Sequence, residues 1–182
     1  MKLVFNRKVN AYLQLLGTLY LLLREARLNG LMSIDGDVDN PVESQLFNAI
    51  APYDKANEAV YTFVCDVLRM VIAGNTDVAD IQRYMDAYRK TTTLSDEQAA
   101  LFECARLTLI ATLNGNAPSF AIEHGRQGVL AEFKPSYQEL DDFVRSVKKE
   151  PEPTTENIEG RLKDFYKSIG AELRLVRNDK GE

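Results

Sequence analysis

Three aspartates alternate along a short stretch of the chain, at Asp35, Asp37 and Asp39. Alternating carboxylates are the ligands that a calcium-binding loop uses, so this spacing is a candidate for metal chemistry. Such a loop needs a glycine at its sixth position and a bidentate glutamate at its twelfth. Here Gly36 falls at the second position and Leu46 at the twelfth. We therefore predict that these acids belong to a charged surface and hold no metal.

Nucleophilic and metal-binding side chains are few in this sequence. The chain has two cysteines, Cys65 and Cys104, and one histidine, His124. A zinc site needs about four such ligands at close spacing, which these three residues do not provide. Cys104 and His124 could act as nucleophile and base, but both cysteines lie within apolar helical patterns, which is typical of buried, reduced thiols. We predict no cofactor and no enzymatic activity.

Charge is unevenly distributed near the start of the sequence. Residues 1–30 carry a net charge of +4, and residues 31–60 carry a net charge of −5. This pattern has two interpretations, a pair of solvated faces or a surface that binds a charged partner. The whole chain has a net charge of −5, which argues against a nucleic-acid partner.

The elements that must position these residues are predicted to be helices, because apolar residues recur at helical spacing through most of the chain. The stretches with this spacing are residues 9–29, 42–50, 60–72, 78–90, 95–113, 118–122 and 136–147. Two of them are short. The sequence therefore predicts an all-α fold, a compact helical bundle of about six helices with a C-terminal tail.

Local signals indicate where several of these helices begin and end. Gly30 and Gly74 each follow an apolar stripe and are expected to stop a helix. The segments 95–98 and 136–139 each place a serine three residues before a glutamine or glutamate. Both read as capping boxes, in which the two side chains bind each other's backbone N–H groups.

Two prolines are expected to open the short helices, because proline needs no N–H partner in a first helical turn. Pro41 would begin a helix over residues 42–50. Pro118 would begin another, with Phe120 and Ile122 on its apolar side.

The last part of the chain has a different composition. Residues 150–155 contain two prolines and alternating acids, which is typical of a linker. One amphipathic helix is predicted over residues 158–169, and residues 172–177 alternate like a strand that has no partner strand. We divide the chain into a helical domain at residues 1–149 and a linker with a tail at residues 150–182.

Five blocks of sequence carry a family resemblance. They are RLNGLMSID at 27–35, NPVESQLF at 40–47, FVCDVLRMVIAG at 63–74, LNGNAP with EHGR at 113–126, and KPSYQEL at 134–140. In this order they resemble the cytoplasmic loop and the C-terminal stretch of MotA, a stator subunit of the bacterial flagellar motor. The resemblance covers residues 7–149.

The resemblance implies a function in motility and chemotaxis. MotA-like subunits form a ring around MotB-like subunits in the bacterial inner membrane and couple ion flow to rotation. On the cytoplasmic side they contact the rotor protein FliG through charged residues, and this contact generates torque. The family's torque-associated glutamate corresponds to Glu43, whereas its arginine corresponds to Gly36. The expected partner-binding residues are Glu43, Asp35, Asp37, Asp39, Arg24 and Arg27.

The membrane helices of that family have no expected counterpart in this chain. The first two would precede residue 7, and the last two would fall in the polar interval 89–101. The longest apolar run, residues 11–23, is too short to span a bilayer. We therefore expect no membrane span and no ion conduction. We also expect a monomer, because much of the ring contact in the family lies within the membrane.

Two functions fit these expectations. The first is a rotor-facing stator domain on the cytoplasmic side that binds FliG through surface charges. The alternative is a free soluble helical adaptor or regulator that retains the fold without a motor role. Either an engineered soluble form or a natural truncated relative would account for the missing spans.

Overall fold

A computed structural model describes residues 7–147 of the chain. The linker, the 158–169 helix and the 172–177 segment that we predict in the tail lie outside the described residues. The described elements are all helical, with α-helices labelled α and 3-10 helices labelled η. They are α1 (Arg7–Asn29), η1 (Leu31–Ile34), α2 (Asp35–Asp39), η2 (Lys55–Asn57), α3 (Glu58–Ile72), α4 (Val78–Thr91), α5 (Asp96–Leu113), α6 (Pro118–Gln127), η3 (Ala131–Phe133) and α7 (Tyr137–Val147).

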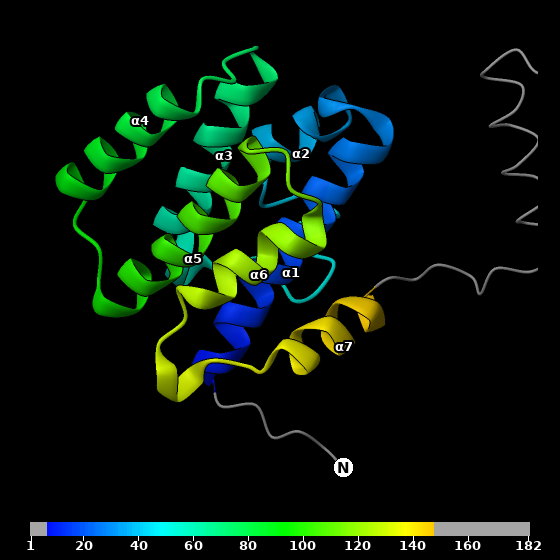
Figure 1. The fold of residues 1–182 in the computed structure, drawn as a ribbon, viewed down its shortest axis with the longest axis vertical. Helices are drawn as coiled ribbons and strands as arrows, with labels where there is room; N and C mark the ends of the chain where they lie inside the picture. Colours follow the sequence, from blue (N-terminus) through cyan, green and yellow to red (C-terminus); the bar gives the residue numbers. More distant parts are fainter. Residues whose placement is uncertain (1–6, 148–182) are drawn as a thin grey trace, which may run out of the picture. The chain divides into compact units, whose positions relative to one another are not determined.

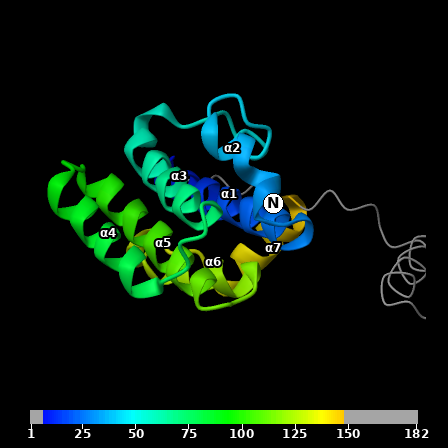
Figure 2. The ribbon, with the colours of Figure 1, turned by 90° about the horizontal axis from the view of Figure 1, so that it is seen from above.

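The predicted all-α bundle is confirmed, with seven α-helices among residues 7–147. Figures 1 and 2 show α1 running through the middle of these helices. It contacts α5, α6 and α7 directly. Residues 9–29 and 95–113, two of the longest predicted helices, therefore pack against each other as α1 and α5.

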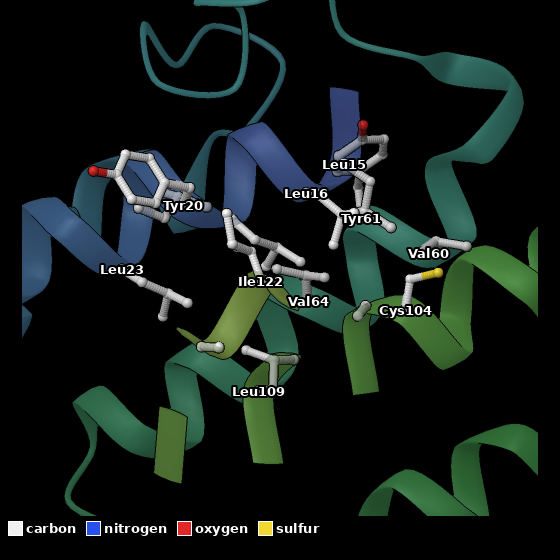
Figure 3. Packing of buried hydrophobic residues seen from close by; sticks show 14 of the residues in the cluster. Leu15, Leu16, Tyr20, Leu23, Val60, Tyr61, Val64, Cys104, Leu109 and Ile122 are labelled. Atoms are coloured by element: carbon white, nitrogen blue, oxygen red, sulfur yellow. The ribbon is translucent and has the colours of Figure 1, made fainter. Parts of the chain in front are cut away.

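Apolar side chains from four helices meet in one core. Figure 3 shows Leu16 and Tyr20 of α1 facing Val64 of α3, Leu109 of α5 and Ile122 of α6. All five are buried. Burial of this apolar surface is the main source of stability for the bundle, because isolated helices of these lengths are marginal in water.

The two predicted glycine stops and the two predicted capping boxes are confirmed. Gly30 and Gly74 have φ angles of 91° and 98°, the left-handed conformation that favours glycine after a helix. At the start of α5, the Ser95 hydroxyl accepts a hydrogen bond from the Gln98 N–H, and the Gln98 side chain accepts one from Ser95. Ser136 and Glu139 form the same reciprocal pair at the start of α7.

The predicted helix over residues 42–50 is wrong. This segment consists of turns, and side chains hold it in place. Asn48 donates through Nδ2 to the Val42 carbonyl at 2.9 Å and accepts from the Tyr53 N–H at 2.9 Å. Gln14 of α1 donates to the Pro52 carbonyl at 3.0 Å. The bond to the Val42 carbonyl replaces one that a helix would have formed internally, and the other two fix the residues that follow the segment.

The predicted orientation of Phe120 is also wrong. α6 does begin at Pro118, and Ile122 is buried as expected. However, the Phe120 side chain is 68% exposed. In an α-helix, positions 120 and 122 are about 200° apart around the axis, so the face that buries Ile122 directs Phe120 toward solvent.

No helix within residues 7–147 combines the length and the hydropathy needed to cross a membrane.

Candidate partner-binding surface

The six charged residues expected to bind a partner lie on consecutive elements at one end of the helical domain. Arg24 and Arg27 belong to the end of α1, the three aspartates form most of α2, and Glu43 lies in the turn that follows. η1 connects these parts and contacts both α1 and α2. Figure 1 shows the end of α1 leading into α2. We call residues 24–43 the 24–43 surface.

The two arginines lie near the C-terminal end of α1. Arg27 is exposed in the last turn of the helix, and Arg24 is half-buried one turn earlier. Cations at this end interact favourably with the partial negative charge of the unpaired helix carbonyls. The helix end therefore stabilises the charge of Arg27 locally.

Asp39 is engaged by a residue of another helix, Arg69 of α3. The Arg69 guanidinium contacts the Asp39 carboxylate at 3.1 Å and the Asp66 carboxylate at 3.0 Å, and it donates to the Val38 carbonyl at 2.8 Å. The hydrogen bond with Asp39 raises the pKa of Arg69. This arrangement fixes the end of α2 on α3 and partly neutralises Asp39.

Arg69 lies outside the 24–43 surface but binds it, and it is not among the six residues expected to bind a partner. The signal was present in the sequence, because the 63–74 block that resembles the family contains Asp66 and Arg69 three positions apart. Residues with this spacing share a helix face, so Asp66 can pair with Arg69 and orient its guanidinium toward a further acid. Sequence alone does not place that face beside Asp39, which lies 30 positions earlier.

Asp35 and Asp37 are both half-buried, and Asp37 forms a hydrogen bond within the fold. The Ser44 hydroxyl donates to the Asp37 carboxylate at 2.5 Å and accepts from the Phe47 N–H at 3.1 Å. Ser44 is buried. Asp35, the first residue of α2, is half-buried. Asp37 therefore orders the turn that carries Glu43, in addition to contributing charge.

Glu43 is exposed on this turn. The Asn40 side-chain amide donates to one of its carboxylate oxygens at 2.8 Å. Gly36, at the position of the family's arginine, is also exposed, and a Cβ there would meet no atom within 4 Å. A longer side chain at residue 36 would therefore be tolerated sterically.

The cysteines and the histidine are not arranged for nucleophilic chemistry. Cys104 is buried in α5, and burial raises the pKa of its thiol to about 12. His124 lies exposed on α6. A reactive cysteine requires a thiolate at neutral pH, which this environment disfavours. Among residues 7–147, no group of three metal-binding side chains is placed to hold an ion.

The EHGR motif joins α6 to the segment before α7. Arg126 contacts the Glu123 carboxylate, with Nε to Oε2 at 2.7 Å, and donates to the Pro135 carbonyl at 2.8 Å. Gly125 allows α6 to approach α5 closely, because a Cβ there would lie 2.8 Å from the Cys104 carbonyl oxygen. These contacts give the motif a structural role.

No protein-family model matches this chain, and no solved structure matches it. It is similar to Motility protein A of Escherichia coli (strain K12), with 25% identity over 218 residues, covering 79% of this chain and 74% of that protein. Motility protein A of Salmonella typhimurium (strain LT2) is 25% identical over 211 residues, covering 75% of this chain and 71% of that protein.

These alignments are longer than the chain itself. The first extends over 218 positions, although only 79% of a 182-residue chain takes part. The aligned part of the relative therefore contains internal residues that have no counterpart here. This agrees with the short interval between α4 and α5, which holds only residues 92–95.

Proposed function

Because the chain is homologous to Motility protein A, we propose that it is the rotor-facing domain of a flagellar stator subunit. In this proposal it acts on the cytoplasmic side and binds the rotor protein FliG through the charges of the 24–43 surface. Torque is transmitted through this contact. Pairing with MotB and assembly into a ring are functions of full-length relatives and are not assigned to this chain.

The arrangement around Glu43 carries the proposal. Glu43 corresponds to the family's torque-associated glutamate, and its carboxylate lies at the surface with Asn40 bound to one oxygen. The hydrogen bond from the Ser44 hydroxyl to the Asp37 carboxylate orders the turn that carries Glu43. A charge on an ordered turn can meet a partner with less loss of conformational entropy than a charge on a mobile loop.

Such a contact should depend on salt. Exposed complementary charges steer association, and at about 0.1 M salt they are screened beyond about 10 Å. Binding through the 24–43 surface should therefore weaken as ionic strength rises. A free adaptor without a motor role would not bind FliG.

The test is a titration of the full chain with the C-terminal domain of FliG at low and high salt. We expect salt-sensitive binding that Glu43→Lys weakens about tenfold at low salt, or about 1.4 kcal/mol. The control is Glu132→Lys, which makes the same charge change at an exposed position in η3. The proposal fails if the folded chain does not bind FliG, or if both variants weaken binding equally.

A further inference from the structure

A chain of polar side chains connects α4 to α2 across α3. The Tyr84 hydroxyl of α4 donates to one oxygen of the Asp66 carboxylate at 3.3 Å. The other oxygen of Asp66 accepts from Arg69 at 3.0 Å. Arg69 in turn donates to the Asp39 carboxylate and to the Val38 carbonyl of α2. Figures 1 and 2 both show α3 between α4 and α2, so these bonds link two helices on different sides of a third.

The hold of α4 on the bundle depends on a small buried face. Of its residues, Ile81 and Met85 are buried. Two tyrosines, Tyr84 and Tyr88, add hydrogen bonds to α3, and the second of them donates to the Ala59 carbonyl at 2.7 Å. Elements with few buried apolar contacts open locally at a lower free-energy cost than the core of a protein. α4 is therefore suited to local opening.

The link through Asp66 is partly shielded from solvent. The side chain of Asp66 is 34% exposed and that of Arg69 is 41% exposed. Burial raises the pKa of Tyr84 to about 12, so its hydroxyl keeps its proton and donates at neutral pH. Hydrogen bonds to a charged group are stronger than those between neutral groups, and bonds in a chain polarise one another. Asp66, bound at both carboxylate oxygens, is therefore an oriented partner for Arg69.

We propose that Tyr84 and Asp66 couple α4 to α2, so that α4 determines how firmly α2 is held on α3. With both oxygens bound, the Asp66 carboxylate is restrained from rotating, and the Arg69 guanidinium stays aligned with Asp39. When α4 moves away from α3, Asp66 loses the Tyr84 hydroxyl and Arg69 loses this alignment. Three acids of the 24–43 surface belong to α2, so α4 acts on that surface from the other side of α3.

Two tyrosine-to-phenylalanine variants separate this coupling from a general loosening of α4. Tyr84→Phe removes the bond to Asp66, whereas Tyr88→Phe removes a bond to α3 that does not involve Asp66. The readout is amide exchange at Asn40, whose N–H closes the last turn of α2 on the Gly36 carbonyl. We expect Tyr84→Phe to accelerate this exchange about threefold. Tyr88→Phe should leave it close to the wild-type rate, and urea denaturation checks that both variants remain folded.

The Arg69→Lys background shows whether the effect travels along the proposed chain. Tyr84→Phe should not accelerate exchange at Asn40 any further in this background, because the link from Asp66 to α2 is already broken. Coupling between two sites is reciprocal. Arg69→Lys should therefore also accelerate amide exchange within α4.

Several results would overturn the proposal. They are no change at Asn40 in Tyr84→Phe, equal acceleration there by Tyr84→Phe and Tyr88→Phe, the same factor from Tyr84→Phe with and without Arg69→Lys, and unchanged exchange within α4 in Arg69→Lys. These measurements use the chain alone, so their outcome is independent of whether it binds FliG.

Discussion

Arg69 of α3 holds part of the 24–43 surface in place. Its guanidinium bridges the Asp39 and Asp66 carboxylates and the Val38 carbonyl. Arginine can do this because its donors point in fixed directions from a planar group. Asp39 therefore contributes to the position of α2, whereas Glu43 lies exposed on the turn that follows.

Replacing Arg69 with lysine should loosen α2. A lysine ammonium is a compact charge that cannot bridge three separated acceptors in one plane. We expect Arg69→Lys to lower the free energy of unfolding by about 1 kcal/mol, since the pair is partly exposed. Amide exchange at Asn40, whose N–H bonds to the Gly36 carbonyl at 3.1 Å, should accelerate.

Arg83→Lys is the matched control for this change. Arg83 forms an exposed ion pair with Asp80 on α4, so its replacement should leave both quantities nearly unchanged. Equal effects of the two variants would contradict the proposed role of Arg69.

At the scale of the elements, the packing of α6 on α5 depends on glycine. A Cβ at Gly125 would lie 2.7 Å from Leu16 Cδ2 of α1 and 2.8 Å from the Cys104 carbonyl oxygen of α5. These distances are too short for a real contact. Gly125 thus allows three helices to approach one another, which explains why a helix interior contains this residue despite its poor helix propensity.

Gly125→Ala should therefore destabilise the bundle. Alanine is the better helix former by about 1 kcal/mol, but the clash in a packed core costs about 1–3 kcal/mol. We expect a net loss in the free energy of unfolding, measured by urea denaturation. Gly36→Ala is the control, because its Cβ would meet no atom within 4 Å. A Gly125→Ala variant as stable as this control would show that α6 can shift without cost.

Elements marked by local signals could be predicted from the sequence. Both capping boxes and the stops at Gly30 and Gly74 use residues a few positions apart, so the sequence contains the whole interaction. The 42–50 segment could not be predicted this way, since Gln14 of α1 holds its end from a distant part of the chain. The charged residues 24–43 could be predicted from a family resemblance, whereas their contact with Arg69 could be seen only in the structure.

At the scale of the whole molecule, ion pairs couple the stability of the helical domain to pH. Glu123 is the clearest case, because it lies partly buried against Arg126, which also binds the Pro135 carbonyl. The hydrogen bond from Arg126 lowers the pKa of Glu123 below its ordinary value of 4.5. A lowered pKa in the folded state means that protonation favours unfolding.

Protonation of Glu123 at acidic pH should therefore lower the free energy of unfolding of the helical domain. The contribution of the pair is complete above pH 4.5, the ordinary pKa, and is lost as pH falls through the lower folded value. We expect wild type to lose up to about 1 kcal/mol more than Glu123→Gln between neutral and strongly acidic pH. Urea denaturation of both proteins across this range measures the difference. Parallel pH profiles would show that the pair contributes nothing.

We propose that the 24–43 surface faces the rotor, and one measurement tests this directly. The most direct measurement is a backbone NMR titration of the full chain, labelled with nitrogen-15, with the FliG C-terminal domain. We expect the shifts to concentrate at residues 24–43 and at the end of α3, where Arg69 binds Asp39. Shifts centred on α7 or α4 with residues 24–43 unchanged, or no shifts at all from a folded chain, would contradict it.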